Sequence, residues 1–359
     1  METKIPYPSV KGRGACDNPD PRFTAFAREG FDDGWSEYEQ ETPALKTEIL
    51  TDSSRTVISY NQSPDVPFDR SINPYKGCEH GCIYCFARPT HAYLDLSPGM
   101  DFETRIFAKP NAAELLEEAL AKPKYRPATI ALGVNTDAYQ PIERKLGITR
   151  DILKVLEAHR HPVSIITKSS LIERDIDILS EMAEQNRVSV AISVTSLDHD
   201  LSRRLEPRAA SPKRRLQTIR TLSDAGIPVG VLTAPVIPAL NDSEIESILS
   251  EIASAGAQWA EYILLRLPHE VKSLFEGWLQ QHRPLKATYV MNLIRDMRGG
   301  KAYASQFGQR MTGTGNHAEL LAQRYKLACK KYGLERRDIS LDNSLFRTPE
   351  QVGEQLALF

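Results

Sequence analysis

The sequence predicts an α/β protein whose main unit is a partial (β/α)6 barrel. From about residue 67, short runs rich in β-branched residues alternate with segments in which apolar residues recur every three or four positions. The apolar runs occupy 128–134, 162–167, 188–194, 228–236 and 261–267, and the helical segments occupy 148–160, 174–185, 211–226 and 241–256. This alternation is typical of a parallel sheet with right-handed crossovers. A cysteine-rich segment before the first run supplies the first of six units, two fewer than a closed eight-unit barrel requires.

Several of the predicted helices have start and stop signals. Thr149, Ser211 and Asn241 lie where helical patterns begin, and such side chains accept hydrogen bonds from the first free backbone amides. Gly226 and Gly256 lie where two patterns end, and glycine readily adopts the left-handed conformation found there. These residues predict the boundaries of the connecting helices.

Composition divides the chain into four regions. Residues 1–65 are polar, with scattered proline, glycine and acidic residues, and predict a partly ordered N-terminal extension. The barrel is expected over 66–270 and a helical C-terminal region over 271–335, with a glycine-rich interruption at 295–315. A polar tail, 336–359, ends in QLALF.

The overall composition is that of a globular cytoplasmic protein. The chain has 359 residues, 41% of them hydrophobic and 26% charged, and a formal net charge of -2. This charge excludes a chain that binds nucleic acid through its overall field, so an anionic partner needs a local patch. The sequence contains neither a signal-peptide pattern nor an apolar run long enough for a membrane span. Cys16 and Cys329 are isolated, which favours a reducing cytoplasm over a disulfide framework.

The most informative stretch is YKGCEHGCIYCFARPT at 75–90, which holds Cys78, Cys82 and Cys85. On a helix these positions would form one buried stripe. Gly77 and Gly81 stand inside the stretch, and each would cost about 1 kcal/mol relative to alanine in a helix interior. Glycine also marks backbone that turns tightly or approaches another group closely, so we expect a metal-binding loop.

The residues alone leave two metal sites open. A structural zinc ion needs four ligands, and His80 or His91 could be the fourth, although zinc loops usually come as two short pairs and no second CxxC occurs. A four-iron cluster ordinarily takes four thiolates. Three thiolates leave one iron open to another ligand.

The CEHGCIYC stretch resembles the CxxxCxxC signature of the radical S-adenosylmethionine (SAM) enzymes, with an aromatic residue before the last cysteine. The resemblance covers about 66–270 and is greatest for the spore photoproduct lyase-like (DNA repair photolyase-like) branch. It is carried by NPYKGCEHGCIYCFARPTH, GVNTDAYQPIERKLGITRDIL, ITKSSLIERDIDIL and SVTSLDHDLSRRLEPRAASPKRRLQTIRTLSDAGIPV.

This resemblance implies the cofactors and the chemistry. Cys78, Cys82 and Cys85 would bind three irons of a [4Fe-4S] cluster, and SAM would bind the fourth through its amino and carboxylate groups. Reductive cleavage of SAM would then yield methionine and a 5′-deoxyadenosyl radical, with a flavodoxin or ferredoxin as the electron donor. Damaged or modified nucleic acid is the expected substrate. Radical modification of a protein or small molecule, and a non-catalytic iron–sulfur or zinc protein that recruits a partner, are the alternatives.

Polar residues at the expected carboxyl ends of the strands are the candidate SAM contacts, because active-site groups of strand–helix barrels lie there. They are Asn135, Thr136, Asp137, Lys168, Ser193 and Thr195. We expect Lys168 to bind the SAM carboxylate, and Ser193 and Thr195 to contact the ribose hydroxyls. The resemblance adds the backbone around Tyr84 against the adenine, and Arg208 near SAM. Asn135, Thr136 and Asp137 could bind the amino group or the ribose, and the last two could equally cap the next helix.

The hydrogen-atom relay of the spore photoproduct lyase-like branch is missing here. That branch uses a tyrosine just after the last cluster cysteine and a cysteine near the second barrel strand. This chain has Phe86 at the first position, and the sequence around Asn135 contains no cysteine. Tyr139 is a possible substitute, and the catalytic residue that quenches the substrate radical stays unassigned.

Two further segments suggest partners. The stretch RRLEPRAASPKRR at 203–215 is either a solvated helix start or a phosphate-binding surface, which Arg295, Arg298, Lys301 and Arg310 could extend. The final pentapeptide resembles the motif that binds the bacterial sliding clamp, with Gln355, Leu356, Leu358 and Phe359 as the contact residues. The alternative is an apolar tail that packs on the barrel.

Overall fold

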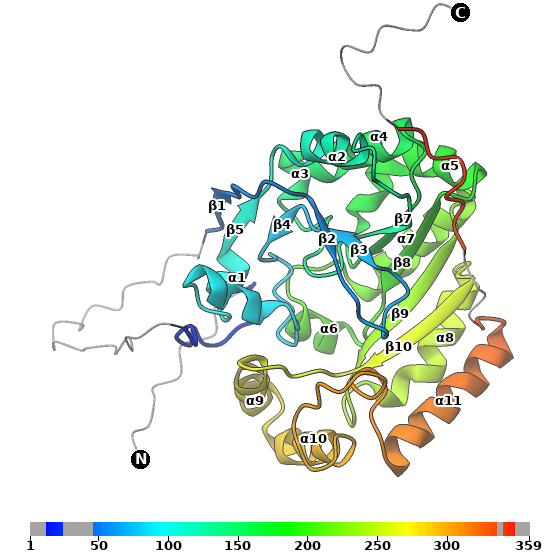
Figure 1. The fold of residues 1–359 in the computed structure, drawn as a ribbon. Coiled ribbons are helices and arrows are strands. Elements are labelled where there is room, and N and C mark those ends of the chain that lie inside the picture. The colour runs from blue at the N-terminus through cyan, green and yellow to red at the C-terminus, as the bar shows by residue number, and fades with distance from the viewer. Residues whose placement is uncertain (1–11, 24–45, 336–339, 349–359) are drawn as a thin grey trace, which may run out of the picture.

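The computed structural model describes residues 12–23, 46–335 and 340–348, and its centre is a seven-stranded sheet (Figure 1). The strand order is β10-β9-β8-β7-β6-β3-β2. The strands span Ile58–Tyr60 (β2), Arg70–Ile72 (β3), Ile130–Leu132 (β6), Val163–Thr167 (β7), Val188–Ser193 (β8), Val229–Val236 (β9) and Trp259–Leu264 (β10). Every neighbouring pair from β3 to β10 is parallel, and β2 is antiparallel to β3. The predicted partial barrel of parallel strands is confirmed.

A smaller sheet lies beside the barrel and carries the cysteine loop. Its order is β1-β5-β4, with β1 at Glu48–Thr51, β5 at Arg105–Ala108 and β4 at Tyr75–Lys76. Strands β1 and β2 lie within the region that the sequence assigns to the N-terminal extension. Each has only three or four residues, too few for an alternating pattern to reveal them.

Helices cover the outer face of the large sheet, as Figure 1 shows. They are α2 (Ala112–Leu120), α4 (Ile148–Ala158), α5 (Ile176–Glu184), α7 (Pro212–Asp224), α8 (Ile245–Ser254) and α11 (Asn316–Tyr332). Strand β8 is buried along its whole length, as expected for a parallel strand covered on both faces. Across the described part of the chain, no helix combines the length and apolar character needed to cross a membrane.

The remaining helices lie near the ends of the strands. They are α1 (Asp101–Thr104), α3 (Glu143–Leu146), α6 (His199–Leu205), α9 (Val271–His282), α10 (Pro284–Asp296) and the 3-10 segments η1 (Arg88–Leu94), η2 (Ser170–Asp175) and η3 (Asp242–Glu244). The glycine-rich stretch 295–315 follows α10 and precedes α11. The C-terminal region is therefore helical with an interruption, as the sequence predicts.

Tertiary contacts replace two of the three expected helix caps. Ser211 caps α7, because its hydroxyl accepts a hydrogen bond from the Arg214 amide at 3.4 Å. Thr149 instead donates to the carbonyl oxygen of Ala138, and α4 already begins at Ile148. The side-chain amide of Asn241 donates to the carbonyl oxygens of Thr195, just after β8, and of Pro235, within β9, and α8 begins only after η3. Both predictions were wrong because partners distant in sequence bind these side chains.

A buried histidine gives stability a pH dependence. The hydroxyl of Tyr125 lies 2.7 Å from Nε2 of His161, whose Nδ1 donates to the Pro162 carbonyl at 3.0 Å. Burial lowers the pKa of His161 from 6.5 to about 4. The neutral imidazole is therefore favoured in the folded protein, and only the unfolded chain takes up this proton between pH 6.5 and 4.

We expect His161 to contribute about 3 kcal/mol to the loss of folding stability between pH 7 and pH 4. A His161→Gln variant keeps a donor and an acceptor but does not titrate, so its stability should fall less steeply over this range. Urea unfolding of both proteins at pH 7, 5.5 and 4.5 measures the difference. Parallel curves for the two proteins would contradict the assignment.

Candidate functional site

The three clustered cysteines lie on an irregular loop at the carboxyl-terminal edge of the parallel sheet. Residues 78–85 form turns and no helix, so the helical-stripe alternative is wrong. Gly77 and Gly81 have φ angles of +82° and +68°. A Cβ on Gly77 would lie 2.9 Å from the Phe102 carbonyl oxygen, and one on Gly81 would lie 2.8 Å from the Glu103 carboxylate. Both positions therefore require glycine, for conformation and for space.

The loop presents three thiols with little exposure to water. Cys78 and Cys82 are buried, Cys85 is half-buried, and all three are free. Burial raises the pKa of each thiol, and neighbouring cysteines add to this effect at Cys78 and Cys82. Thiolates at these positions need a nearby cation, which a bound metal cluster would provide.

Neither candidate histidine makes a single-ion metal site with the thiols, because no three His, Cys, Asp or Glu side chains within 12–23, 46–335 and 340–348 are grouped to hold one metal ion. Nδ1 of His80 lies 3.3 Å from the Asp137 carboxylate, and Nε2 of His91 lies 3.1 Å from the Arg105 carbonyl oxygen. Burial lowers the pKa of His91 to about 4. The donor set offered by the loop is thus three thiols. In an iron–sulfur cluster each thiolate binds its own iron atom, so three sulfurs fit such a group without converging on a single ion.

An N-terminal segment, residues 12–23, packs on the cysteine loop, and sequence reasoning missed it. The backbone amides of Gly14 and Ala15 donate to the Glu103 carboxylate at 2.9 and 2.8 Å. Arg88 donates to the same carboxylate at 2.5 Å, and the side chains of Arg88 and Glu103 are fully buried. In Figure 1 this segment (dark blue) lies beside α1. Its polar composition carried no signal for this contact.

A buried polar network lies under the loop and is centred on Glu206. The carboxylate accepts hydrogen bonds from Tyr84, Thr195 and Arg215, with the Thr195 contact at 2.7 Å. Burial by itself would raise the pKa of Glu206, but Arg215, Lys168 and the Tyr84 hydroxyl outweigh it and lower the pKa to about 2. Glu206 is therefore a buried, paired carboxylate.

Lys168 brings a positive charge to the thiols. It follows β7, is half-buried, and its charge acts on Cys82, Cys85 and Glu206. Its backbone amide donates to Asp137 at 2.8 Å, whereas its ammonium group has no hydrogen-bond or ion-pair partner within 12–23, 46–335 and 340–348. An ammonium in this position is suited to bind the carboxylate of a ligand.

The structure gives Thr136 and Asp137 framework contacts. The Thr136 hydroxyl donates to the Tyr75 carbonyl at 2.7 Å. The Asp137 carboxylate accepts from the Thr167 hydroxyl at 2.7 Å and from the Lys168 amide, and it pairs with His80. Burial by itself would raise the pKa of Asp137. The contacts with His80, the Lys168 amide and Thr167 outweigh burial and lower the pKa to about 2. Only Asn135 of the three consecutive candidates is exposed.

The other candidate contacts are mostly engaged with protein. Ser193 is buried, and its carbonyl accepts from Arg215 at 2.9 Å. Thr195 has no exposed surface, so we assign it to positioning Glu206 instead of the ribose contact expected from the sequence. Arg208 pairs with Glu79 of the cysteine loop at 3.0 Å. Ser193 and Thr195 thus bind members of the Glu206 network, and Arg208 binds the cysteine loop.

Tyr139 does not lie where a hydrogen-atom donor to the site would be needed. Its side chain is fully buried in the main core between sheet and helices, whereas the cysteines belong to separate apolar clusters. Burial and the nearby Asp175 carboxylate raise the pKa of its hydroxyl. Tyr139 is therefore a core residue.

The basic stretch 203–215 is not an open cationic surface. Four of its arginines pair with carboxylates: Arg204 with Asp200, Arg208 with Glu79, Arg214 with Glu173 and Arg215 with Glu206. Two of these partners are local, since Asp200 lies on α6 with Arg204 and Glu206 lies within the stretch itself, whereas Glu79 and Glu173 come from other segments. These pairs reduce the free positive charge of the stretch, and its binding of phosphate stays a prediction.

Comparisons of sequence agree with the geometry of the loop. Residues 72–252, about half of the chain, match the family model of the radical SAM superfamily. Uncharacterized protein Rv2578c of Mycobacterium tuberculosis is 41% identical over 232 residues, which cover 64% of this chain and 68% of that protein. Uncharacterized protein MJ0683 of Methanocaldococcus jannaschii is 27% identical over 248 residues, which cover 69% and 88% of the two chains.

The fold is similar to that of a solved radical SAM enzyme. Spore photoproduct lyase complexed with a dinucleoside spore photoproduct superposes with a TM-score of 0.57 over 79% of this chain and 78% of that one, at 15% identity. A variant of that lyase with bound AdoMet gives the same TM-score. The family implies SAM and an iron–sulfur cluster as cofactors, and the three thiols beside Lys168 fit them. The chain belongs to the radical SAM superfamily and is a radical SAM enzyme.

Proposed function

We propose that this enzyme cleaves SAM reductively at a [4Fe-4S] cluster held by Cys78, Cys82 and Cys85, and that the 5′-deoxyadenosyl radical acts on damaged or modified nucleic acid. The observation that carries the proposal is the loop of three free thiols, turned by two obligatory glycines beside an unpaired ammonium group. The cluster, when bound, supplies the electron that cleaves SAM. A flavodoxin or ferredoxin is the proposed source of that electron.

The residues of the chain would bind and orient SAM. Lys168 is proposed to bind its carboxylate, because the ammonium group lies near two cluster thiols without a protein partner. Asn135 is exposed at the neighbouring strand end and is the proposed contact for the amino group or the ribose. Ser193 and the backbone around Tyr84 remain proposed contacts for the ribose and adenine. The hydrogen bonds that Glu206 accepts from Tyr84 and Thr195 would keep these SAM-binding positions rigid.

The nucleic-acid substrate is supported by the fold, which this chain shares with an enzyme crystallised with a dinucleoside lesion. Phe86 cannot donate a hydrogen atom in the way a tyrosine does, so the fate of the substrate radical is expected to differ from that in the lyase. All five cysteines are free thiols, and we place the activity in a reducing cytoplasm.

The test is anaerobic reconstitution with iron and sulfide, followed by dithionite and SAM, with 5′-deoxyadenosine measured by chromatography. We expect product formation, and a faster rate when ultraviolet-irradiated DNA is added. A protein with about four irons per chain that forms no 5′-deoxyadenosine under either condition would contradict the proposed cleavage. Cleavage that ignores every nucleic acid tested would favour a protein or small-molecule substrate.

We also propose that the C-terminal QLALF binds a bacterial sliding clamp and so brings the enzyme to DNA. The motif residues Gln355, Leu356, Leu358 and Phe359 lie outside the described residues, and the support is the sequence. Deleting 355–359 should weaken clamp binding at least tenfold in a pull-down or by calorimetry, while SAM cleavage stays unchanged. Full clamp binding by the truncated chain would eliminate the proposal.

A further inference from the structure

An exposed aromatic ring stands next to the last cysteine of the loop. Phe86 directly follows Cys85 and keeps 42% of its surface exposed. The guanidinium carbon of Arg266 lies 5.1 Å from the centre of its ring, a cation–π distance. Arg266 comes from the loop that follows β10, at the same edge of the sheet as the cysteine loop. One side of the Phe86 ring is therefore covered by a cation, and another side is open.

Arg266 also joins Phe86 to the glycine-rich segment. Its guanidinium lies 3.5 Å from the Tyr303 hydroxyl and 3.7 Å from the Met311 sulfur. Its Nε is buried and has no hydrogen-bond partner among the described residues. A buried donor of this kind is costly unless a ligand or water satisfies it. The geometry thus leaves one strong donor available beside the ring.

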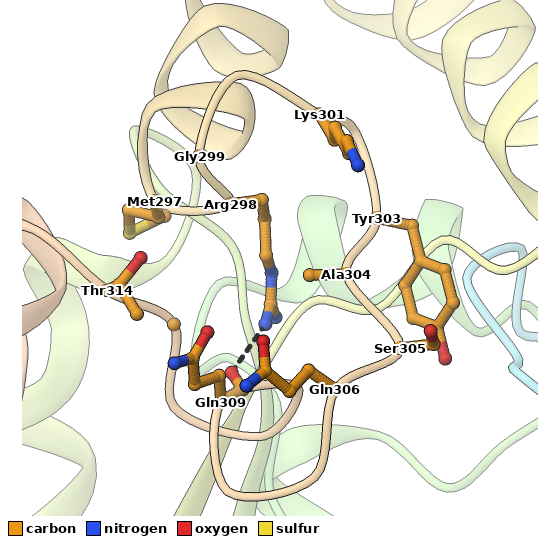
Figure 2. Close-up of a pocket in the computed structure, with 11 residues that line it drawn as sticks. Met297, Arg298, Gly299, Lys301, Tyr303, Ala304, Ser305, Gln306, Gln309 and Thr314 are labelled. Atoms are coloured by element: carbon orange, nitrogen blue, oxygen red, sulfur yellow. Dashed lines mark hydrogen bonds between the residues drawn. The ribbon is translucent and has the colours of Figure 1, made fainter.

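Tyr303, which Arg266 contacts, also lines a cavity of about 380 Å³. Figure 2 shows Arg298, Tyr303, Ser305, Gln306 and Gln309 around it, and Lys301 lies at its edge. The Arg298 guanidinium is fixed by the carbonyl oxygens of Gln309, Arg310 and Leu265, each at 2.9 Å. The cavity therefore has a rigid cationic wall and several amide and hydroxyl groups, which suit a polar, anionic ligand.

Positive charge predominates around this cavity. Burial and the nearby charge of Arg266 lower the pKa of Arg298, so the two cations lie within reach of each other's field. Lys301 adds one more positive charge to the lining, whereas Arg310 lies outside it and is paired with Asp65. Like charges held close together favour the binding of an anion such as a phosphate group.

A second arginine–aromatic group lies across the same loop. Arg22 lies over the rings of Phe23 and Tyr93, at 5.1 and 5.8 Å, and pairs with Glu270 at 3.3 Å. Phe23 and Tyr93 are 57% and 72% exposed. Exposed aromatic rings beside cations are the usual platform for unpaired nucleobases, because every base has a π face.

We propose that Phe86, Arg266 and the cavity in 297–315 bind one unpaired nucleotide of a nucleic-acid strand. The base stacks on the open face of Phe86, and the phosphate lies near Arg266 and Lys301. This inference rests on the proposed function and gives its substrate a binding site. It also gives Phe86 a role that a ring without a hydroxyl can perform.

Fluorescence anisotropy with the reconstituted full chain tests this site. The probes are fluorescein-labelled 15-nucleotide single strands of DNA and of RNA, and a DNA duplex of the same sequence. We expect at least one single strand to bind about tenfold more tightly than the duplex, because stacking needs an unpaired base. The tighter of the two single strands identifies the type of nucleic acid.

Three variants locate the binding. Phe86→Ala and Arg266→Gln should each weaken single-strand binding about tenfold, and Phe86→Tyr should restore it. Tyr289→Ala is the matched control, since Tyr289 is 59% exposed on α10 and no arginine of the described residues has a cation–π contact with its ring. Iron content and the visible spectrum are compared in every variant, because Phe86 adjoins a cluster ligand.

The outcomes separate this inference from the proposed function. Equal binding by wild type, Phe86→Ala and Arg266→Gln, all with full iron content, would overturn the site. Displacement of the labelled strand by an acidic aromatic peptide, when excess unlabelled strand does not displace it, would overturn the site in favour of a protein substrate. SAM cleavage without nucleic-acid binding removes the inference alone. Binding of the single strand by a protein that does not cleave SAM, whether or not nucleic acid is present in the cleavage assay, removes the proposed reaction alone.

Discussion

Replacing Cys82 with alanine is expected to abolish SAM cleavage, with 5′-deoxyadenosine reduced by at least a hundredfold. The thiol is buried on the glycine-constrained loop, and both candidate histidines are engaged with other partners. Removing one of three thiolates leaves two for the cluster, which is too few to hold a four-iron group firmly. The proposed reaction needs that cluster, so both iron content and product formation should fall together.

Cys329→Ala is the matched control for this experiment. Cys329 is a buried free thiol on α11 and packs in the main core, away from the apolar clusters that contain the cysteine loop. Its replacement should leave iron content and 5′-deoxyadenosine formation unchanged. If Cys82→Ala retains four irons and full cleavage, the assignment of the loop as the cluster site is wrong.

Arg215→Met is expected to lower the free energy of unfolding by about 3–5 kcal/mol. Arg215 and Glu206 are 2% exposed each, and Arg215 also donates to the carbonyl oxygens of Ser193 and Ala210 at 2.9 and 2.8 Å. Removal of the guanidinium leaves a buried carboxylate without its cation. The cost of that uncompensated charge is larger than the net value of the pair itself.

A double-mutant cycle with Glu206→Gln isolates this effect. The double variant should be more stable than Arg215→Met alone, because glutamine carries no charge and can still bind Tyr84 and Thr195. Arg214→Met provides the surface comparison, since its pair with Glu173 is 43% exposed on the arginine side and should contribute less than about 1 kcal/mol. Urea unfolding of the wild type and the four variants gives the values. Equal losses for Arg214→Met and Arg215→Met would contradict the buried pair.

Arg214 and Arg215 are adjacent in the sequence but have different roles in the folded protein. Arg214 and Arg215 are neighbours on α7, yet one reaches the surface and the other enters the polar network under the cysteine loop. A helix turns by about 100° per residue, so adjacent side chains point in different directions. A charge run read along the sequence therefore overstates the cationic surface of the folded protein.

The parallel strand–helix units and the position of the cysteine loop could be predicted from local pattern. Alternation of apolar runs with periodic helical segments is a short-range property, and each crossover brings the carboxyl ends of strands to one edge. Lys168 and Asn135 were chosen as candidate SAM contacts in this way, and these roles stay predictions. Strands β1 and β2 were not, because three or four residues carry too little pattern.

The sequence by itself determined the family signature, the six parallel units and the three thiols, because each depends on residue type and spacing within short stretches. The tertiary structure alone decided which polar groups are available to a ligand. It buried Thr195 against Glu206, neutralised most of the basic stretch, and brought Gly14 onto the carboxylate of Glu103. It also placed Arg266 over Phe86, 180 positions away in sequence. Such contacts are set by packing between distant segments, and local spacing contains no record of them.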